Sequence, residues 1–488
     1  MPELVAPRQP FVDGKFVPGD GPTLAVESPA TEETIAEVET ASVPQIEQAI
    51  HAARRTFDAG TWADVPARER AAVLLRMAEH LAARRATLID TVVAEAGAPH
   101  GNATDLQVGA PLEHARRIPE LYLQLPEQEY NPVPPTELAP SGQVAASLNR
   151  YEPVGVVSAI SAYNFPFYLN VWKVFPALMA GCSVVLRPSP LTPLSAMPFG
   201  EAAEAAGLPP GVLNVVIDAA VEGGQLITSH PAVDMVTFTG STAVGRQIMK
   251  QAAETVKKIH LELGGKSAAI YLPEATDHAW MMGMGVFLAH QGQGCALTTR
   301  LLVPDDRKQD VIDKIAEVAP QLPIGDPSDP ANMMGPLINA AQREKSERYV
   351  AVAQEHGARL VTGGRRPPDL PKGYYFEPTV LDVPDNANPA AQDEIFGPVL
   401  SVLGYDDLDD AVRIANDSIY GLAGMVFGDA VEATKVAQRI RAGTVWVNTA
   451  APSCYAPFGG YKQSGIGREM GLHGFREYQE IKHLYVGG

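Results

Sequence analysis

The spacing of apolar residues changes along the chain, and each spacing predicts a different kind of element. Near the start, apolar residues flank Asp13-Gly14 within 11–17. Because Asp-Gly tolerates positive φ angles, this stretch predicts a hairpin with a tight turn. Apolar positions then recur at helical spacing in two stretches rich in Ala, Arg, Glu and Leu, which predicts helices over 43–59 and 66–96, with Pro66 in the first turn of the second.

From residue 154 the pattern becomes an alternation of short β-branched runs with Ala-rich helical segments. It predicts strands at 154–160, 183–186, 212–216, 233–239 and 258–261, and helices at 167–180, 193–206 and 245–255. A second alternation predicts strands at 267–272, 399–404, 424–427 and 443–448, and helices at 276–290, 306–319, 408–416 and 430–439. Such alternation requires mostly parallel sheets covered by helices. We therefore expect an α/β protein in which a second α/β domain follows a dinucleotide-type domain.

Two further segments stand outside these alternations. Residues 126–150 are rich in Pro and fit either an inter-domain connector or an edge hairpin. The tail at 478–486 alternates enough to predict an added strand, which suits edge pairing between subunits.

Length and charge exclude several classes of protein. A chain of 488 residues suggests about two to four domains. A net charge of −19 with no Lys/Arg cluster disfavours nucleic acid and anionic lipid as partners. The most apolar stretch, 154–186, is interrupted by Lys173, Asn164 and two prolines, which predicts buried core and not a membrane segment. The N-terminal residues do not resemble a secretory signal, and three cysteines without a Cys-x-x-Cys pair fit a reducing cytoplasm.

Cys295 is the sharpest chemical candidate. It ends Gly292-Gln293-Gly294-Cys295, directly after a predicted helix. The two glycines favour access to the thiol, and a thiolate is the strongest common nucleophile near neutral pH. A structural role as a small buried hydrophobe is the alternative. That interpretation suits Cys182, which precedes a buried strand, whereas Cys454 lies in a loop and could line a pocket.

Glu262 is a candidate general base at the end of an apolar strand, followed by a glycine pair. Apolar neighbours raise the pKa of a carboxyl group and suit it to proton transfer. The alternatives are an ion pair with Lys266 or a solvated strand-end charge. His260 and His290 lie near the two candidates, but a solvated or hydrogen-bonded histidine is the default expectation. No histidine pattern predicts a metal site.

The strand at 233–239 leads into Gly240-Ser241-Thr242 and then into a predicted helix. Glycines at such a turn let a pyrophosphate approach the amide groups of a helix N-terminus. The full Gly-x-Gly-x-x-Gly fingerprint is absent, so an ordinary capped turn is an equal alternative.

Taken together, these motifs resemble the NAD(P)-dependent aldehyde dehydrogenase superfamily. Seven blocks match in the family's order over nearly the whole chain: 163–166, 238–242, 261–266, 292–295, 394–398, 416–423 and 457–467. Seven ordered matches are far more specific than any one motif. The resemblance implies a Rossmann-type cofactor domain, an α/β catalytic domain and a small β bridging element.

The resemblance also implies roles for individual residues. Cys295 would attack the aldehyde to give a thiohemiacetal, and Asn164 would hold the oxyanion together with the Cys295 amide. Glu262 would activate the water that hydrolyses the resulting thioester. Lys173 and Glu469 occupy positions used for proton relay and cofactor ordering. The cofactor would lie against ten residues: Ile160, Tyr163, Arg187, Ser189, Gly240, Ser241, Gly245, Leu263, Glu394 and Phe396.

One departure from the family concerns the choice between NAD and NADP. Many NAD-preferring members carry Lys-Pro-x-Glu where this chain has Arg187-Pro188-Ser189-Pro190. No carboxylate there would repel a 2′-phosphate, and Arg187 could attract one. We expect NAD to be the cofactor, with weak discrimination against NADP.

The family pattern further divides the chain and suggests a substrate. It implies a cofactor domain at 1–127 and 151–262, a catalytic domain at 263–455, and a bridging element at 128–150 and 470–488 that would form a homodimer or homotetramer. The positions nearest the aldehyde are apolar, which favours an aliphatic, terpenoid or aromatic aldehyde over a semialdehyde. They are Phe165, Leu169, Trp172 and Phe458. The alternatives are a CoA-acylating or semialdehyde dehydrogenase, a cysteine hydrolase, or a catalytically silent binding protein.

Overall fold

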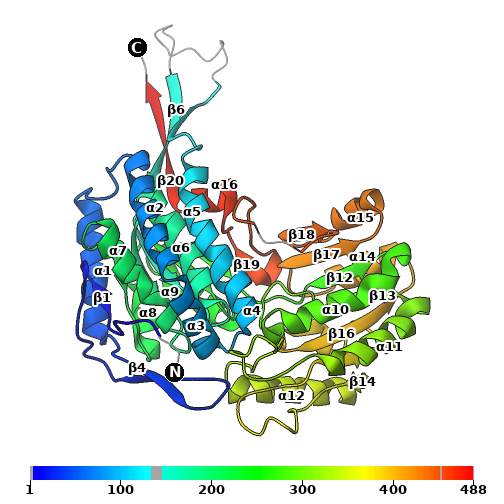
Figure 1. Ribbon diagram of the computed structural model, residues 1–488. Helices are drawn as coiled ribbons and strands as arrows, with labels where there is room; N and C mark the ends of the chain where they lie inside the picture. The colour runs from blue at the N-terminus through cyan, green and yellow to red at the C-terminus, as the bar shows by residue number, and fades with distance from the viewer. Residues whose placement is uncertain (1–3, 133–145, 451–452, 487–488) are drawn as a thin grey trace.

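Two large sheets, each covered by helices on both faces, form the body of the molecule (Figure 1). The computed structural model describes residues 4–132, 146–450 and 453–486. The first sheet has the strand order β19-β11-β10-β7-β8-β9-β1-β2. Its strands are β1 Phe11–Val12, β2 Lys15–Phe16, β7 Val156–Ile160, β8 Ser183–Arg187, β9 Leu213–Val215, β10 Met235–Thr239, β11 Lys258–Glu262 and β19 Gly465–Ile466.

The central strands β11, β10, β7, β8 and β9 of this sheet are parallel, as the first alternation predicts. Apart from Arg187 at the end of β8, the residues of strands β7, β8 and β10 are apolar or small and buried on both faces of the sheet. Helices α1, α8 and α9 cover one face, and α2, α5, α6 and α7 cover the other. These helices and the neighbouring α3 are α1 Val43–Asp58, α2 Ala67–Ala83, α3 Arg85–Ala96, α5 Ala110–Tyr122, α6 Pro166–Ala180, α7 Pro198–Ala206, α8 Val221–Ser229 and α9 Thr242–Ala253.

The second sheet has the order β14-β15-β16-β13-β12-β17-β18 and is parallel except at β14. Its strands are β12 Ala268–Tyr271, β13 Arg300–Pro304, β14 Arg359–Thr362, β15 Thr379–Asp382, β16 Val399–Tyr405, β17 Ala423–Phe427 and β18 Thr444–Val447. Helices α10 and α11 pack on one face, and α12 to α15 pack on the other. These helices are α10 Ala279–Leu288, α11 Lys308–Val318, α12 Ala340–Glu355, α13 Pro389–Gln392, α14 Leu408–Asn416 and α15 Ala430–Ala437.

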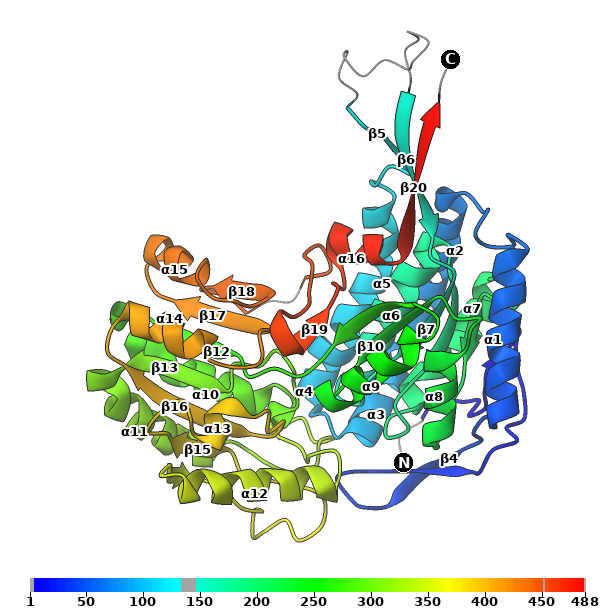
Figure 2. The same ribbon diagram turned by 180° about the vertical axis from the view of Figure 1, so that it is seen from behind.

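Two smaller sheets complete the fold. Strands β5 Gln128–Tyr130, β6 Ala146–Pro153 and β20 Gln479–Val486 form an antiparallel sheet in which β6 and β20 pair over eight residues. This sheet projects away from both large lobes (Figures 1 and 2). Strands β3 Leu24–Glu27 and β4 Thr34–Val38 form a hairpin. The short elements are α4 His100–Asn102, η1 Ala103–Gly109, η2 Leu194–Ala196, η3 Pro273–His278, η4 His290–Gly292, η5 Asp305–Arg307, η6 Ala319–Gln321, η7 Lys462–Ser464 and α16 Gly471–Glu477.

The predicted α/β class is confirmed, and so are most predicted elements of the two alternations. The Asp13-Gly14 hairpin forms, with both residues at positive φ. The Pro-rich stretch forms an edge sheet with the predicted tail strand; its part at 133–145 lies outside the described residues. The predicted domain limits stay a prediction.

Two predicted helices are wrong in their extent. The helix expected over 66–96 is two helices, because at Arg84 the backbone N–H donates to the Leu81 carbonyl, three residues back, while the guanidinium pairs with Glu201 of α7. Pro66 caps the first of them from outside the helix, with ψ 142°. The helix expected over 276–290 begins as η3 and ends at Leu288, after which the chain enters the left-handed region.

The long apolar stretch of the sequence is core, as predicted: α6 is buried along almost its whole length between the first sheet and α5. Across the described ranges, we find no helix that is both long enough and apolar enough to pass through a bilayer.

Candidate active site

Cys295 is positioned by a reversal of the chain after α10. His290, Gln291 and Gly292 all have positive φ, between 52° and 73°. A Cβ at Gly292 would lie 2.0 Å from the carbonyl oxygen of Gly397, so only glycine fits there. The left-handed backbone of the two preceding residues costs on the order of 1 kcal/mol each. The reversal therefore has to be held by tertiary contacts.

Three hydrogen bonds hold this reversal in place. The Gln293 amide N–H donates to the His290 carbonyl at 3.0 Å, and its side-chain oxygen accepts from the Ile338 N–H at 3.0 Å. The Asn164 side-chain amide donates to the Gln293 carbonyl at 2.9 Å. Asn164 thus comes next to Cys295, as the predicted oxyanion role requires, and its amide keeps a second N–H for a ligand.

Two cavities meet at Cys295. One, of about 340 Å³, lies at the carboxyl ends of the central strands of the first sheet. The other, of about 320 Å³, lies between α6, α10 and the second sheet. Three residues line both cavities, namely Asn164, Thr239 and Cys295. A group in one cavity can therefore react with a group in the other at the thiol.

The surroundings of Cys295 favour the protonated form of its thiol. Burial raises its pKa, and the nearby carboxylates of Glu262 and Glu394 raise it further. A base must therefore take the proton when the sulfur attacks.

The first cavity contains nine of the ten residues predicted to contact a cofactor: Ile160, Tyr163, Arg187, Ser189, Gly240, Ser241, Leu263, Glu394 and Phe396. Gly245 is the exception, because it lies inside α9, where a Cβ would meet the Leu263 side chain at 2.6 Å. The cavity is at the N-terminus of α9, whose cap is Ser241. An anionic group bound there would face the amides and positive dipole end of the helix.

Glu394 is held against the glycine pair that follows β11. Its Oε1 accepts from the Gly265 N–H at 2.9 Å, and a Cβ at Gly264 would lie 2.4 Å from its Oε2. Burial raises the pKa of Glu394, which the Gly265 N–H, Lys345 and Lys266 oppose. The carboxylate therefore faces the cavity from a fixed position, as a ribose-binding group would have to.

Arg187 is not free to attract a phosphate. Its guanidinium forms two hydrogen bonds of 2.8 Å to the Asp218 carboxylate, which also accepts from the Ala220 N–H at 2.8 Å. Asp218 is almost fully buried at the start of the turn before α8. The positive charge of Arg187, which the sequence suggests could attract a 2′-phosphate, is therefore neutralised by Asp218 within the protein.

Glu262, the predicted base, lies at the end of β11 with 2% of its surface exposed. Neither of its oxygens has a hydrogen-bond partner among the described residues. Gly459 approaches it so closely that a Cβ there would lie 2.6 Å from Oε1. Burial raises the Glu262 pKa strongly, and so does Glu469, while Lys173 and Arg468 oppose the rise. A carboxyl group in this state is suited to accept a proton near neutral pH.

Lys173 and Glu469 form a buried ion pair of 2.7 Å behind Glu262. Lys173 also donates to the Thr237 hydroxyl at 3.1 Å. Neither residue lines the two cavities. The structure therefore brings them close to the base but away from the thiol.

The second cavity is almost entirely apolar. All four residues predicted to surround the substrate line it, namely Phe165, Leu169, Trp172 and Phe458. Trp172 is fixed by its indole N–H, which donates to His114 Nδ1 at 3.0 Å. Sequence reasoning missed Tyr168, which lies on α6 beside Leu169. It also missed wall residues that come from other elements: Leu106, Met282, Val286, Leu297, Met425 and Trp446.

Two polar residues of α12 were also missed in the cofactor cavity. Gln342 lines it and donates to the carbonyls of Ile395 and Phe396 at 2.9 and 2.8 Å, which holds Phe396 at its positive φ of 62°. Lys345 lines the same wall. The helix is mostly polar, so no apolar pattern in the sequence marked it.

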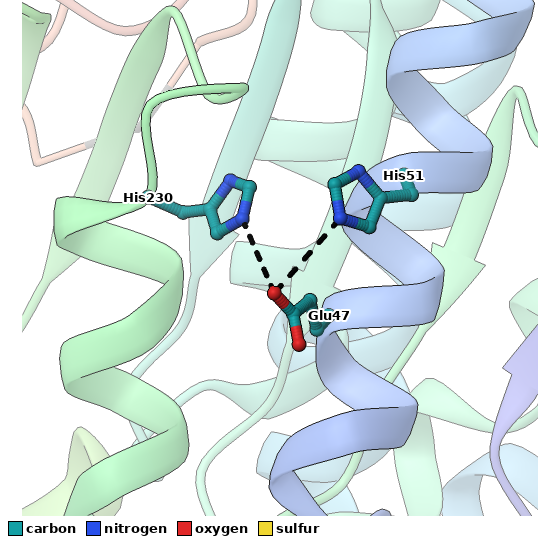
Figure 3. A group of neighbouring side chains, drawn as sticks. All are labelled: Glu47, His51 and His230. Carbon is teal, nitrogen blue, oxygen red and sulfur yellow. Dashed lines mark ion pairs between the residues drawn. The ribbon is translucent and has the colours of Figure 1, made fainter.

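A third cluster, far from Cys295, joins α1 to α8. Figure 3 shows His51 and His230 pointing at the Glu47 carboxylate, each with Nε2 at 3.9 Å from it. His230 Nδ1 accepts from the Ala232 N–H at 3.1 Å, so the neutral ring carries its proton on Nε2. That nitrogen faces Glu47 across 3.9 Å, which is beyond hydrogen-bond range, and three potential metal ligands meet here.

Comparison with known proteins agrees with this geometry. The sequence profile of the aldehyde dehydrogenase family matches residues 16–484. The geranial dehydrogenase of Castellaniella defragrans is 38% identical over 481 residues, which are 98% of each chain. An aldehyde dehydrogenase of Pseudomonas syringae, crystallised as a cysteine-to-alanine variant with NAD+ and octanal, is 38% identical with a TM-score of 0.92, over 98% of this chain and 96% of that one.

A second solved structure gives the same picture. The betaine aldehyde dehydrogenase of Staphylococcus aureus in complex with NAD+ is 35% identical with a TM-score of 0.92, over 98% of this chain and 94% of that one. Family profile, relatives and structures agree over nearly the full length. The chain belongs to the aldehyde dehydrogenase family and is an oxidoreductase that uses NAD to oxidise aldehydes.

Proposed function

We propose that this enzyme oxidises an apolar aldehyde to its carboxylic acid through a thioester on Cys295. The observation that carries the proposal is the position of Cys295, where an apolar cavity meets the cofactor cavity. An aldehyde in the apolar cavity would place its carbonyl carbon at the sulfur and its chain among aromatic and aliphatic side chains.

NAD fits the first cavity on three observations. The N-terminus of α9 faces it, the glycine pair at 264–265 lets Glu394 approach closely, and the buried Thr239 hydroxyl has no partner among the described residues. Ser241 and the α9 amides would hold the pyrophosphate, Glu394 the nicotinamide ribose, and Phe396 would pack beside the ring. When bound, NAD supplies the acceptor for the hydride that leaves the thiohemiacetal carbon, which converts that adduct to a thioester.

The protein's own groups perform the other steps. Glu262 takes the thiol proton as sulfur bonds to the carbonyl carbon. The oxyanion accepts hydrogen bonds from the free side-chain N–H of Asn164 and from the backbone N–H of Cys295. Before the second half, Glu262 releases the thiol proton to solvent; it then takes a proton from water while the water oxygen bonds to the thioester carbon. The carbon–sulfur bond breaks, the acid leaves, and the Cys295 thiolate takes the proton from Glu262, which restores both groups.

The composition of the apolar cavity supports an aliphatic, terpenoid or aromatic substrate. Neither Lys nor Arg is among its lining residues within the described chain, so nothing there would pair with the carboxylate of a semialdehyde. The geranial dehydrogenase and the enzyme crystallised with octanal are relatives whose ligands have this character.

A panel of aldehydes tests this function. We would follow NADH absorbance with octanal, geranial, benzaldehyde, betaine aldehyde and succinic semialdehyde, in the wild type and in Cys295→Ala, without CoA. We expect kcat/KM for the three apolar aldehydes to exceed that for the two charged ones by at least roughly a hundredfold, because a charge buried without a partner costs several kcal/mol. Cys295→Ala should still bind NAD but form no NADH. Preference for a charged aldehyde, or a requirement for CoA, would contradict the proposal.

We also propose a homo-oligomer, dimeric or tetrameric, that forms through the projecting β5–β6–β20 sheet. Its strand β20 exposes several apolar side chains, which are Ile481, Leu484, Tyr485 and Val486. Edge strands with exposed apolar residues pair readily with another chain. The three free cysteines are consistent with the reducing cytoplasm proposed as its location.

A further inference from the structure

His260 lies directly behind the proposed base. It is two residues before Glu262 on β11, and because side chains alternate along a strand, the two point to the same face. The His260 side chain is 1% exposed, and its Nε2 lies 3.6 Å from Glu262 Oε1. Neither Nε2 nor either Glu262 oxygen has a hydrogen-bond partner in the described part of the chain. His260 is thus not solvated, and it is hydrogen-bonded through Nδ1 but not through Nε2.

The hydrogen bonds behind His260 favour one position for its proton. The Lys173 ammonium can only donate, and it donates to Glu469 at 2.7 Å and to the Thr237 hydroxyl at 3.1 Å. Thr237 therefore accepts from Lys173 and can give its own hydrogen to His260 Nδ1, 3.0 Å away. A neutral imidazole whose Nδ1 accepts carries its proton on Nε2.

His260 stays neutral in this environment. Burial holds its pKa well below the usual histidine value, and the positive charges of Lys173 and Arg468 lower it further. A neutral ring with Nε2–H cannot take a proton from Glu262 at that nitrogen. It can, however, donate a hydrogen bond to the ionised carboxylate.

We propose that His260 is a positioning residue for Glu262: its Nε2–H fixes the orientation of the carboxylate and stabilises its ionised form. The inference rests on the proposed function, in which Glu262 is the base. A movement of a few tenths of an ångström would bring the 3.6 Å separation into hydrogen-bond range. Thr237 and Lys173 act through His260, since they hold the ring in the tautomer that donates forward.

The charges around Glu262 shift its pKa in both directions, and the His260 donor opposes those that raise it. Burial and the Glu469 carboxylate favour the protonated acid, whereas Lys173 and Arg468 favour the carboxylate. The groups that face it are Lys173 from α6, His260 from β11, Arg468 and Glu469 from the segment after β19, and the Cys295 thiol. Loss of the Nε2–H should therefore leave Glu262 protonated to a higher pH and the enzyme inactive to a higher pH.

Two substitutions separate this role from a structural one. His260→Leu removes the donor at similar volume. In His260→Gln the side-chain NH2 can donate to Glu262 while its oxygen accepts from Thr237. We would measure kcat and kcat/KM for octanal and NAD from pH 5.5 to 9.5 in both variants and the wild type.

In His260→Leu we expect the acid limb of the kcat profile to move up by about one pH unit, as loss of one hydrogen bond to a carboxylate implies. The limb of His260→Gln should lie close to that of the wild type. KM for NAD should change less than about twofold, because His260 does not line the cofactor cavity. Equal losses at every pH in both variants, or an unmoved limb in His260→Leu, would overturn the role.

Thr237 provides a second test should His260→Leu fail to fold. Thr237→Val removes the hydroxyl that sets the tautomer, and Thr237→Ser keeps it. We expect the acid limb to move up in the valine variant alone, and matching profiles in the two would overturn the inference. If the wild type itself forms no NADH from any aldehyde, the proposed function fails first, and this role falls with it.

Discussion

At the scale of single residues, Asp218 neutralises the charge of Arg187 in the cofactor cavity, although the sequence suggests that this charge is available to a ligand. The sequence predicts an arginine that could bind a 2′-phosphate. In the structure, however, the Nε and Nη2 groups of Arg187 both donate to the Asp218 carboxylate at 2.8 Å. Nothing near residues 187–190 indicates this partner, which lies about thirty positions away. We therefore expect the choice between NAD and NADP to depend on a contact that only the fold reveals.

Releasing Arg187 should increase the use of NADP. In Asp218→Asn the Ala220 N–H keeps its acceptor, but the guanidinium loses its counter-charge. We expect kcat/KM for NADP to rise by roughly tenfold relative to NAD, since a charge-assisted contact to phosphate is worth 1 to 2 kcal/mol. Steady-state kinetics with both cofactors measure this ratio. The double variant Asp218→Asn/Arg187→Gln is the control, and a gain that persists in it would disprove the role of Arg187.

At the scale of elements, the turn after α10 decides where Cys295 lies. Gly292 has φ +73° and is in contact with the backbone of Gly397, so a methyl group has neither the conformation nor the space it needs. Gly292→Ala should lower kcat by at least about a hundredfold through misplacement of the thiol. Gly101→Ala is the matched control, since nothing lies within 4 Å of a Cβ there. Aldehyde oxidation and NAD binding are to be measured in both; a fully active Gly292→Ala enzyme would contradict this account of the loop.

His114, on α5, should make stability depend on pH. Burial lowers its pKa to about 4, and its Nδ1 accepts from Trp172 of α6. Since the folded-state pKa lies below the unfolded value of 6.5, the unfolded chain binds more protons between pH 6.5 and 4. Stability is therefore lost as pH falls through that window, by at most roughly 3 kcal/mol.

His114→Gln removes the imidazole that titrates and keeps a side-chain oxygen that can accept from the Trp172 indole N–H. We would measure the midpoint of thermal unfolding by circular dichroism. Between pH 6.5 and 4.5 this midpoint should fall less in the variant than in the wild type. An unchanged slope would mean that His114 is not the group that titrates.

The elements themselves were predictable where the pattern was simple. The runs at 183–186 and 235–239 consist mostly of apolar or β-branched residues and are buried on both faces, so their sequence alone predicts interior parallel strands. Strand β13 was missed because it begins with Arg300, a buried guanidinium whose four bonds go to residues 266, 386, 414 and 415. Helix α12 was missed because it buries only three residues. In both cases tertiary contacts, and not local pattern, determine the element.

The same distinction applies to the site. Cys295 and Glu262 were predicted because each lies in a short motif with local chemistry, and Asn164 was predicted from the family resemblance. Asp218, Gln342 and Thr237 act through partners that are distant in sequence, and no motif contains both members of any of these pairs.

At the scale of the whole molecule, the projecting sheet should control assembly. Ile481 and Tyr485 lie on one face of β20 and are 64% and 55% exposed. Ile481→Lys/Tyr485→Lys should shift the protein to a smaller species in sedimentation velocity, because like charges would meet across a symmetric interface. Glu480→Gln, on the other face, should sediment as the wild type does. A wild-type protein that is monomeric at micromolar concentration would contradict the proposed role of this sheet.

The most direct test of the whole account is to stop the reaction at its proposed covalent stage. Glu262→Gln keeps the shape of the buried side chain but can neither take the thiol proton nor activate water. With octanal and NAD, acylation should then be slow because the thiol has to lose its proton to solvent, and NADH formation should stop after about one equivalent per active site. Intact-protein and peptide mass spectrometry should then find a single octanoyl group, attached to the peptide that contains Cys295. Continued turnover without an adduct, or an acyl group on any other residue, would contradict the mechanism.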